Sequence, residues 1–64
     1  MVELNASFSE PARAREVERK LQALRVRDIQ PGDGGLSITA HVEDGVVDRA
    51  LHLIEETGGT ADLH

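Results

Sequence analysis

Histidine and carboxylate groups make up most of the side chains in this chain that could bind a metal or catalyse a reaction. The chain has three histidines, twelve acidic residues and no cysteine. Two of the histidines, His41 and His64, and the carboxylate of Glu3 fall on the polar side of segments in which apolar and polar residues alternate. Two imidazoles and a carboxylate suit Zn(II), Ni(II) or Cu(II), with water completing the ligand shell. The alternative is that all three are polar surface residues and that the terminal His64 frays.

A second group, Ser9, Glu10 and Arg13, lies where a helix is expected to begin. Ser9 is a suitable N-cap, and Pro11 fits the first helical turn, where its missing N–H costs nothing. Glu10 and Arg13 are three residues apart and can pair across the helix surface. Alternatively, the loop and the helix N-terminus can dock onto a protein partner or hold an anion. The spacing is compatible with each of these interpretations.

Hydrophobic periodicity predicts the elements that position these groups. Alternation of apolar and polar residues predicts strands, and apolar residues three or four apart predict helices. The elements follow the order strand, helix, strand, strand, helix, strand. The strands are expected over residues 2–8, 26–30, 36–42 and 60–64, the first helix between the cap Ser9 and residue 24, and the second between the caps Asp44 and Gly58.

Elements with one apolar face each predict an α+β fold, a ferredoxin-like βαββαβ plait with two helices on one face of a four-stranded antiparallel sheet. Right-handed crossovers favour the strand order 4-1-3-2. Pro31 directly follows the second strand and favours a position at the sheet edge. In this order His41 and His64 lie on the strands that flank Glu3, about 9–10 Å apart at the backbone. A divalent metal site at one end of the open sheet face is the resulting hypothesis.

The composition of the chain argues against nucleic acid and membranes as binding partners. The net charge of -5 disfavours nucleic acid and anionic membrane surfaces. Phe8 is the only aromatic residue, so the chain has no platforms on which single-stranded bases could stack. No apolar run approaches the ~20 residues that span a bilayer, and no signal segment opens the chain. We expect one domain over residues 1–64, in the cytoplasm, without membrane insertion.

The residue inventory also argues against an enzyme. The chain has no cysteine nucleophile and no tyrosine. The glycines at 32–35 join two expected strands, so no helix N-terminus points at them as in a phosphate-binding loop. A chain of 64 residues leaves little room for a water-excluding pocket of about 300 Å³ or more. We therefore expect a non-enzymatic protein with no cofactor beyond the hypothetical divalent metal.

Several motifs resemble those of the heavy-metal-associated domain of copper chaperones and copper-transporting ATPases. That family has a Gly-Met-x-Cys-x-x-Cys loop before a helix with Val-Glu-Lys-x-Leu, a Gly-Val-x-x-Val sequence leading into its second strand, and a closing Ile-Glu-x-x-Gly. The resemblance covers nearly the whole chain and implies the family's fold. The corresponding residues are Ser-Phe-Ser-Glu-Pro-Ala-Arg at 7–13, Val-Glu-Arg-Lys-Leu at 17–21, Val-Arg-Asp-Ile at 26–29 and Ile-Glu-Glu-Thr-Gly at 54–58.

The resemblance fails at the metal site of the family. Glu10 and Arg13 occupy the positions of its two cysteines, and neither a carboxylate nor a guanidinium suits Cu(I). Phe8 matches the methionine that packs beneath the loop, and Gly59 stands where the family often has Tyr or Phe. The resemblance thus implies an interaction module that docks through its loop, Ser9 to Arg13, onto a protein partner or onto itself. The alternative is a metal-binding or metal-transport domain that uses Glu3, His41 and His64.

Overall fold

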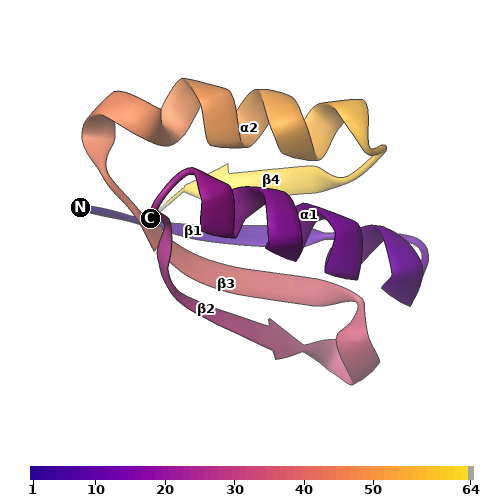
Figure 1. Ribbon diagram of the computed structural model, residues 1–64. Helices are drawn as coiled ribbons and strands as arrows, with labels where there is room; N and C mark the ends of the chain where they lie inside the picture. Colours follow the sequence, from indigo (N-terminus) through magenta and orange to yellow (C-terminus); the bar gives the residue numbers. More distant parts are fainter. Residues whose placement is uncertain (64) are drawn as a thin grey trace.

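A computed structural model describes residues 1–63 and shows four strands and two helices in the predicted order (Figure 1). Two short 3₁₀ turns, η1 (Asp33–Gly35) and η2 (Asp44–Val46), precede β3 and α2. The remaining elements are β1 (Val2–Ser7), α1 (Pro11–Ala23), β2 (Arg27–Gly32), β3 (Ser37–Val42), α2 (Val47–Glu56) and β4 (Thr60–Leu63).

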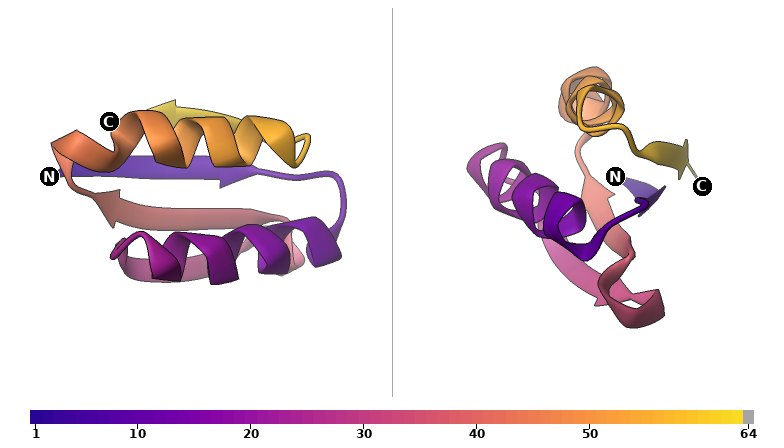
Figure 2. Two further views of the ribbon diagram at one scale, coloured as in Figure 1. Left: turned by 45° about the horizontal axis from the view of Figure 1, so that its top comes forward. Right: turned by 90° about the vertical axis from the view of Figure 1, so that its right-hand side faces the viewer.

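The four strands form one antiparallel sheet in the order β2-β3-β1-β4. Read from the other edge, this is the predicted order 4-1-3-2. Both helices cover the same face of the sheet, and the other face is open (Figure 2). The predicted ferredoxin-like α+β arrangement is confirmed, and so is the position of β2 at an edge.

The hydrophobic core lies between the helices and the sheet, and every buried residue among positions 1–63 is apolar. Leu4 and Ala6 of β1 pair with Ala40 and Ile38 of β3, so alternate residues of both central strands point toward the helices. Burial of these side chains provides the main driving force for folding. The helices contribute Ala14, Val17, Leu21, Ala50 and Ile54, and the other core residues are Leu4, Ala6, Phe8, Val26, Ile38, Ala40 and Val42.

Both helices end in the same hydrogen-bonded motif. At the end of α2, Gly58 donates to Glu55 and Gly59 donates to Ile54, which is the Schellman pattern. Gly58, the residue after the C-cap Thr57, has φ 86°, so its predicted role as the left-handed residue that ends the helix is confirmed. The end of α1 repeats this pattern with a non-glycine residue, because Arg25 has φ 62°. There, Arg25 donates to Gln22 and Val26 donates to Leu21.

Four strand boundaries differ from the prediction, and the first is the end of β1, which lies at Ser7 and not at Phe8. β2 begins at Arg27 because the N–H of Val26 bonds back to α1. β2 then continues through Pro31, which an edge strand tolerates because an edge residue needs no partner on its outer side. β3 begins at Ser37, and Leu36 lies at the end of η1 with 36% of its surface exposed.

Both predicted N-caps were wrong. Glu10, not Ser9, occupies the N-cap position of α1, and it acts through its backbone carbonyl, which accepts from Arg13 and Ala14. Asp44 begins the 3₁₀ turn η2, so α2 starts only at Val47. Neither helix has a side-chain cap hydrogen bond. The chain enters each helix through backbone turns that satisfy some of the N–H groups a side chain would otherwise bind.

Candidate functional site

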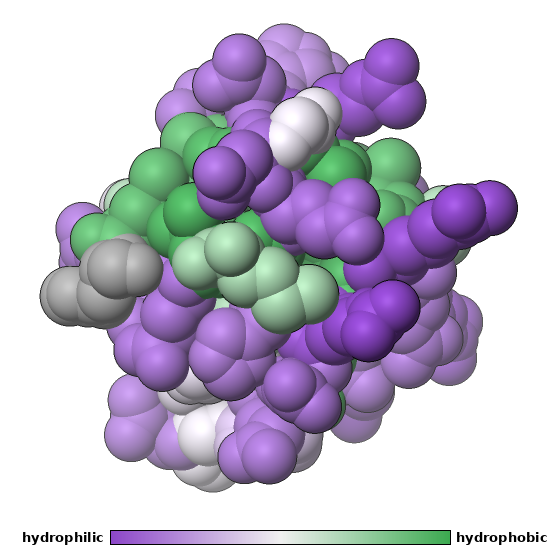
Figure 3. Space-filling view, turned by 90° about the vertical axis from the view of Figure 1, so that its left-hand side faces the viewer, coloured by the Kyte–Doolittle hydropathy of each residue, from purple (hydrophilic) through white to green (hydrophobic). Residues whose placement is uncertain are grey.

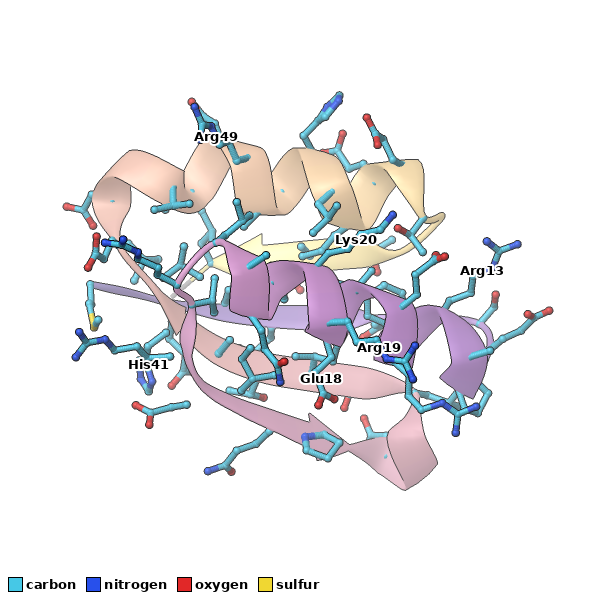
Figure 4. All side chains as sticks on the ribbon, in the orientation of Figure 1. Arg13, Glu18, Arg19, Lys20, His41 and Arg49 are labelled. Atoms are coloured by element: carbon cyan, nitrogen blue, oxygen red, sulfur yellow. The ribbon has the colours of Figure 1, made fainter. Side chains whose placement is uncertain are left out.

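The predicted docking loop is exposed, but its charged residues do not pair with each other. Ser9, Glu10 and Arg13 are all exposed, and no ion pair joins Glu10 to Arg13. Figure 4 shows Arg13 pointing away from the molecule at the start of α1. The interpretation of these two residues as a surface ion pair is therefore wrong for this structure. Pro11 and Ala12 are the exposed apolar residues of the loop, whereas the larger Phe8 is buried beneath it with only 7% of its surface exposed.

The open sheet face brings together two of the three predicted metal ligands. Glu3 and His41 are register partners in β1 and β3, and Glu3 Oε2 lies 4.0 Å from His41 Nε2. Their side chains are about half exposed, at 46% for Glu3 and 40% for His41. The third predicted ligand, His64, lies outside the described residues.

The structure adds a residue to this cluster that the sequence did not indicate. Asp28 Oδ2 lies 3.2 Å from His41 Nδ1, a contact that lacks hydrogen-bond geometry. Asp28 has φ 54°, and the register of β2 against β3 shifts between Arg27 and Gln30. Such an irregularity redirects side chains at a sheet edge. Regular alternation gives no signal for this contact, because the contact depends on the bulge.

The geometry of His41 separates the two carboxylates. Glu3 approaches Nε2 and Asp28 approaches Nδ1. These two nitrogens point away from each other across the imidazole ring, so one metal ion cannot bind His41 together with both carboxylates. Accordingly, no three metal-ligating groups converge anywhere within residues 1–63. The pair that remains for a metal is Glu3 with His41 Nε2.

A groove between the two helices is the most distinctive surface feature, and the sequence did not predict it. It has a volume of about 310 Å³. Leu24 and Leu53 are half-buried in it and Ala23 is exposed, so its floor is apolar. Figure 3 shows the end of the molecule where α1 ends and α2 begins, and apolar surface gathers there between hydrophilic side chains. The groove is lined by Lys20, Ala23, Leu24, Arg49, His52, Leu53 and Glu56.

Cations stand on both sides of the groove. Lys20 projects from α1 between the helices, and Arg49 extends from α2 (Figure 4). Neither cation lies within ion-pair distance of a carboxylate of residues 1–63. The acidic Glu56 contacts His52 instead, with 2.6 Å between Glu56 Oε1 and His52 Nε2. A second hollow of about 390 Å³ shares Lys20 and adds Arg15, Arg19 and the acidic Glu16, so the two hollows together are lined by four basic and two acidic residues. The surface around the groove is therefore locally basic.

This basic region contrasts with the rest of the chain. Helix α1 contains four basic and two acidic residues, a net charge of +2. Because the whole chain carries -5, the remaining residues carry -7. Hence a charged partner meets an attractive or a repulsive surface depending on the side from which it approaches.

The chain matches no protein-family model, no curated protein and no solved structure. Within residues 1–63, neither helix has the length and apolar character needed to cross a membrane. The function is therefore inferred from the geometry of the groove and of the open sheet face.

Proposed function

We propose that this chain is a small non-enzymatic interaction module, a relative of the heavy-metal-associated domain without its cysteine pair, which binds a protein partner through the groove between α1 and α2. The observation that carries the proposal is the partly exposed apolar floor, formed by Ala23, Leu24 and Leu53, between cations that have no ion-pair partner within residues 1–63. Apolar surface rimmed by polar residues is typical of interaction sites. The predicted loop at Ser9 to Arg13 is less suitable, because its exposed apolar residues, Pro11 and Ala12, include no large side chain.

The size of the groove indicates the strength of binding. Full burial of an exposed leucine contributes about 1.5–3 kcal/mol, and because Leu24 and Leu53 are already half-buried, burying the rest of both contributes roughly 1.5–3 kcal/mol together. Association costs at least as much in lost motional freedom, so the groove alone supports weak, reversible binding. A standard interface covers about 800 Å² per partner, roughly a fifth of the 4153 Å² surface of this chain. A partner must therefore also contact the charged flanks.

Site-specific photo-crosslinking tests the proposed function. A photoreactive amino acid replaces Leu53 in the groove or Thr39 on the open sheet face, and the labelled chain is irradiated in cells of its source organism. We expect a discrete crosslinked product from position 53 and none from position 39. The same product from both positions, or from neither, would contradict a specific role for the groove.

A second candidate function, divalent metal binding, is supported by one observation. The register places Glu3 and His41 together on the open face, with 4.0 Å between carboxylate oxygen and imidazole nitrogen. The proposed third ligand is His64. Titration of ¹⁵N-labelled protein with Zn(II), Ni(II) or Cu(II) should shift or broaden the amide signals of Glu3 and His41, and His41→Ala should abolish the effect. An unchanged response in His41→Ala would exclude this site.

A further inference from the structure

The shape of the groove favours a helical occupant. On α2 its lining residues run from Arg49 to Glu56, two turns or about 10 Å of helix. They fall at the spacing i, i+3, i+4 and i+7, and Lys20, Ala23 and Leu24 repeat part of this spacing on α1. Two helices lined in this way form a trough into which the apolar stripe of a third helix fits, as in other helix-in-groove interfaces.

A small molecule fits this groove less well. Its volume of about 310 Å³ is at the lower limit for small-molecule pockets. Such pockets enclose most of the ligand surface. Here, the flanking side chains of His52 and Glu56 are 72% and 60% exposed, so a bound small molecule would stay largely in water.

The charges around the groove indicate the sign of the charge that a bound helix carries. Lys20 and Arg49 lie on opposite sides of the apolar floor, and Arg15 and Arg19 continue the basic surface along α1. The acidic Glu56 is already in contact with His52. Carboxylates on both flanks of an apolar stripe would meet Lys20 on one side and Arg49 on the other. A basic helix would place its cations against these same residues.

We propose that the groove binds an acidic amphipathic helix of another protein. Its apolar residues, at i, i+3 or i+4, and i+7, lie on Leu24 and Leu53, and its Asp or Glu side chains contact Lys20 and Arg49. This inference rests on the proposed function and specifies the partner. A second copy of this chain is a poorer occupant, because the apolar faces of α1 and α2 are both buried in its own core.

Selection from a peptide library provides the test. The library displays two- to three-turn helices on a stable scaffold, with every outward position varied among Leu, Ala, Glu, Lys and Gln. It is selected against the intact chain, and enriched peptides are then titrated into ¹⁵N-labelled protein. We expect enrichment of leucine at the groove-facing positions and of glutamate beside them, with amide shifts at Ala23, Leu24 and Leu53.

Matched charge variants separate the groove from the overall charge. Lys20→Glu/Arg49→Glu and the control Arg13→Glu/Arg27→Glu change the net charge equally, but only the first pair borders the groove. The first variant should bind the enriched acidic peptides about tenfold or more weakly than the unchanged chain does. The control should change their affinity by about twofold or less. Circular dichroism of both variants verifies that they are folded.

Three outcomes would overturn the inference, and they differ in whether they also contradict the proposed function. Enrichment of basic or uncharged helices whose amide shifts map to the groove would refute the acidic partner and leave the groove as a binding site. Equal weakening by both double variants would show that net charge, not the groove, selects the peptides. Enriched helices that shift amides only on the open sheet face would contradict both the inference and the proposed function.

Discussion

Gly59→Ala is expected to destabilise this chain far more than an ordinary glycine-to-alanine change. A Cβ at this position would lie 2.5 Å and 2.7 Å from two ring carbons of Phe8, and 3.0 Å from the carbonyl oxygen of Ser7. Ordinary contacts of a Cβ are 3.4–4 Å long. The Phe8 ring must therefore move by nearly 1 Å, and 93% of the residue is already enclosed. Glycine is required here to leave space for the ring and not for its backbone freedom.

The expected cost follows from overpacking, which typically takes 1–3 kcal/mol from the free energy of unfolding. At about 0.05–0.15 kcal/mol per residue, a 64-residue chain has roughly 3–10 kcal/mol in total. Urea denaturation followed by far-UV circular dichroism measures the change, since the chain has no Trp or Tyr for fluorescence. Gly45→Ala is the control, because a Cβ there meets nothing within 4 Å. The control should change stability by less than about 0.5 kcal/mol.

A double-mutant cycle identifies the Phe8 ring as the cause. Phe8→Leu removes the ring edge that faces Gly59, so Gly59→Ala should cost less in this background, by about 1 kcal/mol or more. The two changes would then be non-additive, as expected for residues in direct contact. Equal costs in both backgrounds would refute the reasoning, because the clash with the ring would then not be the source of the destabilisation.

Three further substitutions test the core and the helix ends by the same urea assay. Phe8→Ala should remove about 3–5 kcal/mol and leave the chain largely unfolded, and a well-folded variant would show that the ring does not contribute to the core as described. Arg25→Gly should stabilise the chain by roughly 0.5–1 kcal/mol, because φ 62° is unfavourable for a side chain with a Cβ; a loss of stability would contradict this. Gly58→Ala should have the opposite sign and a cost of about 1 kcal/mol, and a neutral result would mean that the turn after α2 adjusts freely.

The sequence predicted the parts of the fold that depend on which face of each element is buried. Leu4, Ala6, Ile38 and Ala40 alternate with polar residues because one side of the sheet packs on the helices, and this pattern is visible in the chain itself. The edge position of β2 followed from Pro31 and the crossover rule together. Both predictions depend on local chemistry and a few topological rules.

The errors arose where backbone groups compete with side chains for the same hydrogen bonds. Ser9 and Asp44 are good N-caps by residue type, but the carbonyl of Glu10 and the 3₁₀ turn η2 occupy those roles. The contact between Asp28 and His41 requires a register shift in β2, which alternation cannot reveal. Helix boundaries and bulges depend on how the chain enters and leaves its neighbours, and that is a property of the assembled fold.

The groove could not have been predicted for a related reason. Leu53 precedes the buried Ile54 on α2, Leu24 is the C-cap of α1, and both leucines are only partly buried at the margin of the core. Each helix by itself shows a solvated face beside an apolar stripe. The two leucines form a common surface only because the helices lie side by side over the sheet with their flanks facing each other.

For an acidic partner, the side from which it approaches this chain decides between attraction and repulsion more than the net charge of the chain does. A chain of net charge -5 repels an anion at long range, but this repulsion is screened beyond about 8–10 Å at physiological salt. Close to the surface, the excess of +2 on α1 attracts it, whereas α2 has Arg49 but three acidic residues, and the sheet side is acidic with Glu3 and Asp28. For the proposed acidic helix, the attraction therefore comes from α1 on one side of the apolar floor and from Arg49 on the other. The same asymmetry disfavours self-association through the open sheet face, because that contact would bring the carboxylates of two copies together.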